Sequence, residues 1–425
     1  MGPVKILWVK ANKLLPLHSG GDIRSYHIAR YLASRHDLCF LSYYDGSSDP
    51  DYERRLAEDF PGVCCVCTGR PESGPARVLD YISRLGDRAP YAVSRFKSAP
   101  VQRKLKEWLT PEGFDVAVCD FLDAAVNFPA SHEVPVVLFQ HNVESEIWRR
   151  HAETEKNSAK RKIYAMECRK MIAYEKAAVK RFPQVIAVSE HDRKLMSAWV
   201  DPSRITVVPT GVDLRQYQPD FSQQDLQPLV MFVGAMDWEP NIDAVEFFCK
   251  EVWPAVLTRI PQAKFRIVGR NPDRRVERFA GASIEVTGRV PEVIDQLREA
   301  AVVIVPLRIG GGTRLKIYEA MAAGKAIVST SIGAEGLDVH HGRDITLADD
   351  PRAFAEAILM LLENADIRKR YERAAAELAA RYDWPAVAAR FEDVLQKAAG
   401  YAAMRPAEHL PDRGIHSAAT DRPAL

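Results

Sequence analysis

One stretch of the chain, residues 302–337, restricts the possible folds more than any other. Val302–Val305 and Ala326–Ser329 are short continuous apolar runs, which are typical of parallel strands buried on both faces. The glycine loop Gly310–Gly312 and a helical pattern that ends near Gly324 lie between them. Parallel strands need a long crossover connection, which is most often a helix. The stretch therefore predicts a strand–helix–strand unit of an α/β protein.

The glycine loop and the start of the following helix form a candidate anion site. Thr313 can cap the helix, whose bare N-terminal amides attract negative charge. Lys316 adds a cation in the first turn, and Glu319 shares its face of the helix three residues later. A cation for phosphate beside a carboxylate for hydroxyls suits a sugar nucleotide. The alternative is a loop without a ligand beside an exposed ion pair.

Strands and helices alternate on both sides of this stretch, in two series. The first series runs from a strand at Val4–Val9 to one at Ile205–Val208, and the second begins at Leu229. The intervening Gln216–Pro228 is polar and lacks periodicity, which is typical of a linker. Such alternation predicts parallel sheets covered by helices on both faces. We expect an N-terminal domain over residues 1–215, a linker over 216–228, a C-terminal domain over 229–383, a helix over 384–400 and a flexible tail over 401–425.

The composition indicates a cytoplasmic protein. A net charge of +1 over 425 residues gives no overall attraction to nucleic acid or anionic lipid. The seven cysteines are scattered, and Cys64 and Cys67 have no second pair to complete a zinc or redox site, so buried thiols in a reducing compartment are expected. The sequence has no export signal at its N-terminus and no apolar run near the ~20 residues of a membrane span.

Residues 148–181 have the pattern of one long helix with a strongly basic face. Its apolar stripe consists of Ile163, Met166, Met171, Tyr174 and Val179. The basic side chains are Arg149, Arg150, Lys156, Lys160, Arg161, Lys162, Arg169, Lys170, Lys176, Lys180 and Arg181. A solvated helix face is the simpler interpretation, and contact with an anionic membrane surface or an acidic acceptor is the sharper one. We expect no nucleic acid partner, because no aromatic side chains are interleaved on this face.

Two further candidate positions follow strands of the first series. Ser19, Gly20 and Gly21 lie between the first strand and its helix, and His141 follows the strand that ends at Phe139. Ligands of open α/β sheets bind at the carboxyl ends of strands, which favours both positions. A tight turn and a structural, hydrogen-bonding histidine are the simpler explanations.

Several familiar motifs are absent. No G-x-G-x-x-G follows either first strand, which removes the main support for a dinucleotide-dependent dehydrogenase. Gly324-Lys325 lacks the other residues of a phosphate-binding P-loop, and no metal-ligand motif is present. We therefore expect no metal and no cofactor.

Sequence motifs in both series together resemble one enzyme family. These motifs are Glu319-Ala320-Met321-Ala322 with Gly324, Ser329, Gly333-Ala334-Glu335-Gly336, His18–Gly21, Ser189 and Pro209–Asp213. From Val4 to about Lys397 the chain resembles the retaining, nucleotide-sugar-dependent glycosyltransferases of the GT-B fold, the group that includes glycogen synthase-like and lipopolysaccharide or exopolysaccharide enzymes. The resemblance implies two Rossmann-like domains facing a central cleft, with the C-terminal helices packing back toward the first domain.

The resemblance also implies roles for individual residues. Glu319 would bind ribose hydroxyls, and His141 would contact a sugar hydroxyl near the anomeric carbon. The diphosphate would be held by the amides of Gly311, Gly312 and Thr313 with Lys316, supported by Arg314 or Arg308. Ser19, Gly20 and Gly21 would close over the diphosphate or the acceptor, the nucleobase would lie near Gly288 to Val290, and Gly234 would line the donor site.

Three positions differ from the pattern of many relatives. Gly311 occupies the place of a second glutamate, Thr210 that of an asparagine, and residues 235–238 lack the usual arginine and lysine. The resemblance implies metal-independent transfer of a sugar, with retention, from a nucleoside-diphosphate sugar to a carbohydrate or lipid-linked acceptor, in the cytoplasm or at the inner face of the membrane. A sugar-nucleotide epimerase on the same fold and a catalytically degenerate membrane-associated scaffold are the alternatives.

Overall fold

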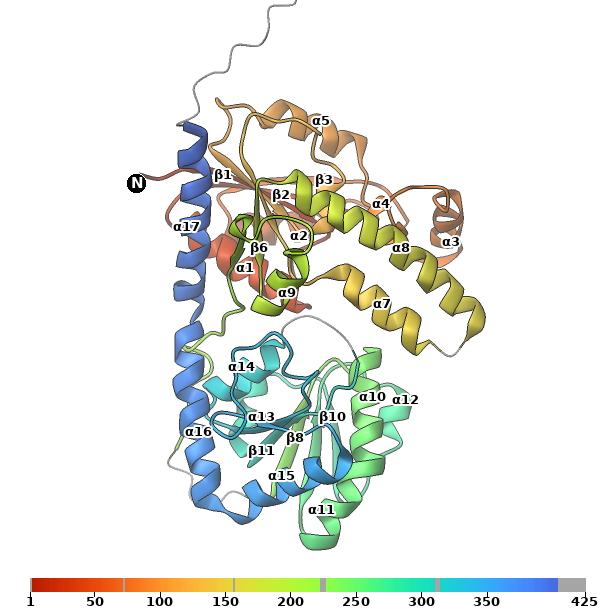
Figure 1. The fold of residues 1–425 in the computed structure, drawn as a ribbon, viewed down its shortest axis with the longest axis vertical. Helices are drawn as coiled ribbons and strands as arrows, with labels where there is room; N and C mark the ends of the chain where they lie inside the picture. Colours follow the sequence, from red (N-terminus) through yellow and green to blue (C-terminus); the bar gives the residue numbers. More distant parts are fainter. Residues whose placement is uncertain (1, 72, 156, 222–226, 310–313, 404–425) are drawn as a thin grey trace, which may run out of the picture.

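The protein consists of two α/β domains, one above the other in Figure 1. The computed structural model describes residues 2–71, 73–155, 157–221, 227–309 and 314–403. Within them, the first domain contains a seven-stranded sheet of order β3-β2-β1-β4-β5-β6-β7, and the second a six-stranded sheet of order β10-β9-β8-β11-β12-β13. Every recorded pairing between these strands is parallel. The predicted α/β class is confirmed.

The first sheet is buried on both faces, as its apolar runs predict. Its strands are β1 (Lys5–Ala11), β2 (Asp37–Tyr44), β3 (Gly62–Cys67), β4 (Val116–Asp120), β5 (Val136–Phe139), β6 (Gln184–Ala187) and β7 (Ile205–Val207). Alternate side chains of β1 enter two different cores, Ile6 and Trp8 one and Leu7 and Val9 the other. Cys64 and Cys67 lie on β3, and all seven cysteines are unbridged.

The helices of the first domain cover both faces of this sheet. They are α1 (Gly20–Ala33), α2 (Pro50–Asp59), α3 (Gly74–Ser83), α4 (Tyr91–Ser94), α5 (Ala99–Trp108), α6 (Leu122–Ala125), α7 (Glu144–Thr154), α8 (Ser158–Arg181) and α9 (Glu190–Met196). In the described part of the chain, no helix is both long and apolar enough to cross a membrane.

The prediction of a single helix over residues 148–181 is wrong. Two helices, α7 and α8, form an antiparallel hairpin there (Figure 1). Glu155 has an extended backbone that ends α7, and the Asn157 side chain caps α8 by accepting hydrogen bonds from the amides of Ala159 and Lys160. Helical periodicity continues through both segments, so only the capping asparagine marks the break. Lys156, one of the expected basic residues, lies outside the described residues.

The second domain has the same layered construction. Its strands are β8 (Leu229–Val233), β9 (Lys264–Val268), β10 (Ile284–Gly288), β11 (Val302–Val305), β12 (Ala326–Ser329) and β13 (Thr346–Leu347). Its helices are α10 (Glu239–Phe247), α11 (Trp253–Arg259), α12 (Arg274–Glu277), α13 (Val293–Glu299), α14 (Leu315–Ala322), α15 (Pro351–Glu363) and α16 (Ala365–Ala379). Strands β11 and β12 have the bounds predicted from their apolar runs, and α14 lies between them.

The last described helix, α17 (Trp384–Ala403), leaves the second domain and packs on the first (Figure 1). The Phe391 ring contacts those of Trp8 and Phe139, with centroids 5.5 and 5.0 Å apart. Glu392 forms an ion pair with Arg35. The expected return of the C-terminal helices to the first domain is therefore confirmed. Residues 404–425 of the expected tail and 222–226 of the expected linker lie outside the described residues.

Candidate active site

A cavity of about 430 Å³ lies between the two domains. The first domain contributes the end of β1, the start of α1, the end of β4, the loop after β5 and the first turn of α7. The second domain contributes Trp238 and Arg314. The strands of a parallel sheet end together, so the carboxyl edge of the first sheet forms one wall of the cavity.

The start of α1 is fixed by a capping box between Ser19 and Asp22. The Ser19 Oγ accepts a hydrogen bond from the Asp22 amide at 3.1 Å, and the Asp22 carboxylate accepts one from the Ser19 amide at 3.2 Å. A Cβ added to Gly20 would lie 3.1 Å from Leu315 of α14, and one added to Gly21 would lie 3.7 Å from the His141 ring. Gly20 thus faces the second domain, and Gly21 faces His141 across the cavity wall.

The His141 imidazole is held in one orientation and one tautomer. Its Nε2 lies 2.7 Å from Asp120 Oδ1, and its Nδ1 accepts a hydrogen bond of 3.3 Å from Arg24 Nε. Because a guanidinium can only donate, the ring proton is on Nε2. Burial lowers the pKa of His141 to about 4, although Asp120 opposes this shift. At neutral pH the cavity therefore contains a neutral, fixed imidazole.

The loop that carries His141 is fixed by a buried carboxylate of α8. Glu175 accepts hydrogen bonds from the amides of Glu144 and Ser145, at 2.9 and 3.0 Å, and from the Gln140 side chain at 3.1 Å. A carboxylate at the N-terminus of α7 also complements the helix dipole. The long helix α8 thus fixes the position of the His141 loop through Glu175.

Two charged residues missed in the sequence support His141. Asp120, fully buried, accepts a hydrogen bond of 2.9 Å from the Trp8 indole, and Lys10 Nζ lies 3.3 Å from Asp22 and 3.7 Å from Asp120. Burial opposes the charge of Asp120, but Lys10 and His141 outweigh it and hold the pKa of Asp120 below its usual range. Lys10 and Asp120 are direct partners in the β1–β4 register. In the sequence, the signal that could have identified Lys10 and Asp120 is that each is a charged residue at the end of a buried apolar run.

Asp123 is a second carboxylate of the cavity wall. Burial raises the pKa of Asp123 to about 7, and Lys10 opposes this rise. Among the described residues, no side chain donates a hydrogen bond to its carboxylate. Asp123 can therefore accept a hydrogen bond from a bound hydroxyl group.

In the second domain, the predicted residues Lys316 and Gly234 lie close to each other, and neither lines the cavity that contains His141. The Lys316 ammonium donates a hydrogen bond of 3.1 Å to Asn241 Oδ1 and lies 4.6 Å from the centroid of the Phe232 ring. A Cβ added to Gly234 would be 2.6 Å from Asn241 Nδ2 and 2.8 Å from Lys316 Nζ, so a larger residue there would displace both side chains. Burial lowers the pKa of Lys316 to about 7, and Arg314 adds to this effect.

Helix α14 begins at Leu315, with Arg314 in the N-cap position. The expected capping residue Thr313, together with Gly311 and Gly312, lies outside the described residues. The buried Arg314 guanidinium lies 5.6 Å from the centroid of the Trp238 ring, and burial lowers the pKa of Arg314 to about 10. Arg314 and Trp238 are the second domain's contribution to the cavity, and sequence reasoning did not select Trp238.

The remaining predicted donor residues lie farther along the second domain. Glu319, on α14, forms a hydrogen bond with Tyr217, and burial raises the pKa of Glu319 although Lys316 opposes the rise. Gly288 ends β10 with a φ of +67°, and its carbonyl accepts from the Gly269 amide at 3.1 Å. Val290 packs against the hydrophobic core of the second domain. None of these three lines the cavity that contains His141.

The two domains also meet through an ion pair. Arg150 of α7 donates two hydrogen bonds of 2.8 Å to Glu335, which belongs to the predicted Gly333–Gly336 motif. Arg149 binds Glu146 and Glu153. Arg149 and Arg150, expected on an open basic face, are thus engaged in ion pairs within the protein. Arg308, the reserve phosphate ligand, binds Asp243 at 2.6 Å.

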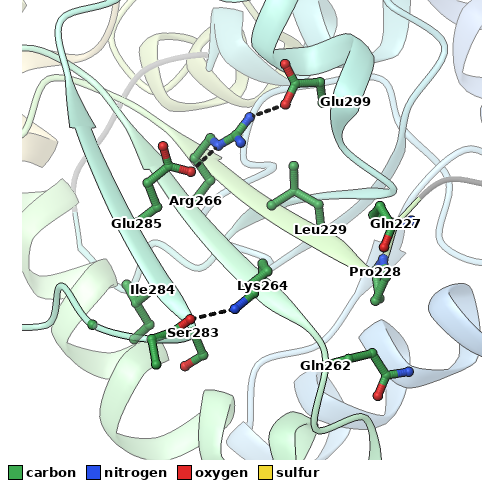
Figure 2. Close-up of a pocket in the computed structure, with 12 residues that line it drawn as sticks. Gln227, Pro228, Leu229, Gln262, Lys264, Arg266, Ser283, Ile284, Glu285 and Glu299 are labelled. Carbon is green, nitrogen blue, oxygen red and sulfur yellow. Dashed lines mark hydrogen bonds and ion pairs between the residues drawn. The ribbon is translucent and has the colours of Figure 1, made fainter.

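A larger cavity, of about 620 Å³, lies at the opposite edge of the second sheet, where β8, β9 and β10 begin (Figure 2). Arg266 binds Glu285 and Glu299 there, at 2.7 and 2.6 Å, and Lys264 donates to the Ala282 carbonyl. The Arg266 charge is thus neutralised by two glutamates within this cavity. Because ligands of parallel sheets bind at carboxyl edges, the interdomain cavity is the better candidate site.

Comparisons with known proteins place this site in a family. Residues 19–216 match the model described as Glycosyltransferase Family 4, and residues 227–364 match that of Glycosyl transferases group 1. The phosphatidyl-myo-inositol mannosyltransferase of Mycolicibacterium smegmatis is 25% identical over 78% of this chain and 84% of its own. The GDP-mannose:cellobiosyl-diphosphopolyprenol alpha-mannosyltransferase of Xanthomonas campestris is 28% identical over 52% of this chain and 60% of its own.

The fold is similarly represented among solved structures. Anabaena HepE in complex with UDP superposes with a TM-score of 0.65 at 15% sequence identity, covering 92% of this chain and 100% of that one. At this identity the likeness concerns the fold, which is the two-domain arrangement that the sequence motifs imply. With both domains matched in order by family models, the chain belongs to the group 1 glycosyltransferases and has the GT-B fold.

Proposed function

We propose that the protein transfers a hexosyl group, with retention of anomeric configuration, from a nucleoside-diphosphate sugar to an acceptor hydroxyl in cell-surface polysaccharide or glycolipid synthesis. The observation that carries this proposal is the cavity itself, in which Arg314 at the start of α14 faces the fixed neutral His141. The names of the mannosyltransferase relatives support a lipid-linked acceptor, and UDP in the HepE structure supports a nucleotide donor.

The leaving diphosphate would be stabilised mainly by the second domain. The N-terminus of α14, Arg314 and Lys316 would supply positive charge there, and Glu319 would bind the ribose. The amides of Gly311 and Gly312, which lie outside the described residues, are proposed as further donors. Fixed cations of this kind can take the place of a metal ion, so we propose that transfer is metal-independent. Undiminished turnover after treatment with a chelator would agree with this proposal, and loss of turnover restored by a divalent cation would contradict it.

The acceptor would bind against the first domain. His141 would contact the donor sugar, and Asp123 would accept a hydrogen bond from an acceptor hydroxyl. No protein nucleophile is needed if the acceptor attacks from the side of the leaving group. Closure of the two domains would orient both substrates. We place the reaction in the cytoplasm, at the inner face of the membrane.

A thermal-shift screen of nucleoside-diphosphate sugars tests the proposal directly, because ligand binding to the folded state raises the melting temperature. A shift identifies the base and the sugar, and the product formed with an acceptor then shows the anomeric configuration. Formation of an isomeric sugar nucleotide without any acceptor would indicate an epimerase. Absence of donor binding and hydrolysis would indicate a catalytically degenerate scaffold, and either result would overturn the proposal.

A further inference from the structure

Helix α3 lies at the protein surface. None of its ten residues is buried, although its sequence is amphipathic. Val78, Leu79 and Ile82 are 58, 67 and 55% exposed, and Leu85, just after the helix, is 40% exposed. At 100° per residue Val78, Leu79 and Ile82 lie within an arc of about 100°, so they form one apolar stripe, and Leu85 follows the C-cap of the helix. Clustered apolar side chains in water indicate an interaction surface.

The neighbouring surface of α8 is cationic. Helix α8 has eight lysines and arginines and two glutamates, and both glutamates, Glu167 and Glu175, are buried. Lys160, Arg161 and Lys162 are exposed at its first turns. The exposed charge of α8 is thus positive throughout, in a chain whose net charge is only +1.

Helices α3 and α8 lie side by side (Figure 1). Lys170 of α8 donates a hydrogen bond of 2.8 Å to the Leu85 carbonyl, and Glu167 accepts one of 2.7 Å from the Tyr91 amide. Ile163 lies one and two helical turns before these two residues on the same face of α8, and it is 45% exposed. Ile163 belongs to the apolar stripe expected for this segment, and its exposure adds an apolar side chain to the surface of α8.

We propose that the stripe of Val78, Leu79, Ile82 and Leu85, bordered by the cations of α8, docks on a bilayer that contains anionic phospholipid. An apolar face inserts among acyl chains while flanking cations bind the phosphates, as in interfacial amphipathic helices. A symmetric contact with a second copy would bring two cationic α8 faces together, which their repulsion opposes. An anionic surface complements both features.

The position of this surface connects it to the cavity. Ile147 of α7 lines the cavity, and α7 packs against α8. Docking through α3 and α8 therefore brings the first domain's side of the cleft near the lipid surface. This consequence, delivery of a lipid-linked acceptor, rests on the proposed function, whereas docking itself requires no activity.

Co-sedimentation with lipid vesicles tests the proposal. The wild-type protein is expected to sediment with vesicles of phosphatidylcholine mixed with phosphatidylglycerol, more weakly at high salt, and not with phosphatidylcholine alone. Leu79→Ser with Ile82→Ser should lower the partition coefficient about tenfold or more, because each side chain loses apolar burial. Lys160→Gln with Lys162→Gln should lower it about fivefold for each lysine.

Two control variants keep the result specific. Ile172→Ser changes an apolar residue of α8 with 41% exposure that lies off the face toward α3, and Lys250→Gln removes an exposed lysine of the second domain. Both should sediment as the wild type does. Equal binding of the α3 double variant and the wild type would overturn the proposal. So would dimerisation of the wild type, abolished in that variant, since a second copy would then be the occupant.

Donor binding separates this inference from the proposed function. The α3 double variant should retain the melting temperature and the donor-induced shift of the wild type, because none of its changed residues touches the cavity. A wild-type protein that binds vesicles but no sugar nucleotide would leave the docking surface intact and overturn the enzymatic proposal. A protein that binds sugar nucleotides but no anionic vesicles would overturn the docking proposal and leave the enzymatic proposal intact.

Discussion

Lys316 combines burial with a short network of neutral partners. Its ammonium contacts Asn241 and the Phe232 ring, and among the described residues no carboxylate lies within ion-pair distance of it. A cation in this setting is stabilised by an arriving anion more than an exposed, paired lysine would be.

Replacing Lys316 should therefore impair catalysis rather than folding. Lys316→Ala is expected to lower kcat by about two to three orders of magnitude, as for other fixed groups that stabilise a leaving anion. Lys250→Ala, which removes an exposed lysine paired with Glu246, is the matched control and should be silent. Steady-state kinetics with a melting curve measure both effects. Full activity of Lys316→Ala would exclude its phosphate role.

Donor binding should also depend on pH near neutrality. Since burial lowers the pKa of Lys316 to about 7, the free enzyme loses this charge as pH rises above 7. A bound diphosphate favours the charged form, so binding at pH 8 should take up a proton and the affinity should fall from pH 7 to pH 9. Calorimetry in buffers of different ionisation enthalpy measures the uptake. No proton uptake by the wild type, or the same uptake by Lys316→Ala, would contradict this assignment.

The sequence predicted the residues that act through their own chemical type or spacing. Gly20, Gly21 and His141 meet at the cavity because strand ends of a parallel sheet coincide. Lys10 and Asp120 were missed because their significance lies in their pairing, and the register of β1 with β4 joins residues far apart in the chain. The roles of Gly311, Gly312 and Thr313 stay predictions, since these residues are not described.

At the scale of elements, α17 depends on one close backbone approach. A Cβ added to Gly211 would lie 2.5 Å from the Trp384 ring, and Trp384 begins α17. Helix α17 then packs through Phe391 against the core of the first domain that contains Trp8. A side chain at position 211 would thus displace the start of the helix.

Gly211→Ala should consequently destabilise the protein. Overpacking of this kind costs about 1–3 kcal/mol, and the melting temperature should fall by several degrees. Gly281→Ala is the control, because its added Cβ would have no neighbour closer than 3.9 Å. Calorimetric unfolding of both variants gives the comparison. Equal melting temperatures would show that α17 adjusts without cost.

Element boundaries followed local signals where such signals exist. The strands β11 and β12 agree with their patterns because their apolar runs define their ends. The sequence pattern predicts one helix in place of the α7–α8 hairpin because the reversal of the chain depends on the cap at Asn157. Sequence periodicity indicates which face of a helix is apolar. It does not reveal a turn between two helices when the apolar spacing continues through both.

The whole molecule is held in this arrangement partly by Arg150 and Glu335. Both side chains are about one fifth exposed, and their two hydrogen bonds cross from α7 to the second domain. Although burial opposes its charge, Arg150 holds the pKa of Glu335 below its usual range. Glu335 therefore adds to the free energy of unfolding at pH values above the ordinary pKa of glutamate. This contribution is lost as the pH falls through the lowered pKa of Glu335.

A double-mutant cycle measures this contact between the domains. Arg150→Ala, Glu335→Ala and the double variant should give a coupling free energy of about 1 kcal/mol at pH 7, as for a partly exposed bidentate pair. The coupling should weaken as the pH falls from 7 through the lowered pKa of Glu335. Urea unfolding over a series of pH values provides the data. A coupling of zero at pH 7 would show that the pair does not stabilise the closed arrangement.

The chain crosses between the domains twice, and the two crossings touch. The Val212 amide donates to the Tyr382 carbonyl at 2.8 Å, the Trp384 amide donates to the Val212 carbonyl at 3.3 Å, and Val212 forms a bridge with Asp383. One loose linker would allow the domains any relative orientation. Two crossings tied to each other act as a hinge, which leaves rotation about a single line as the easiest motion. The width of the cleft is then controlled by one angle, and substrates or lipids that bind on either side act on the same coordinate.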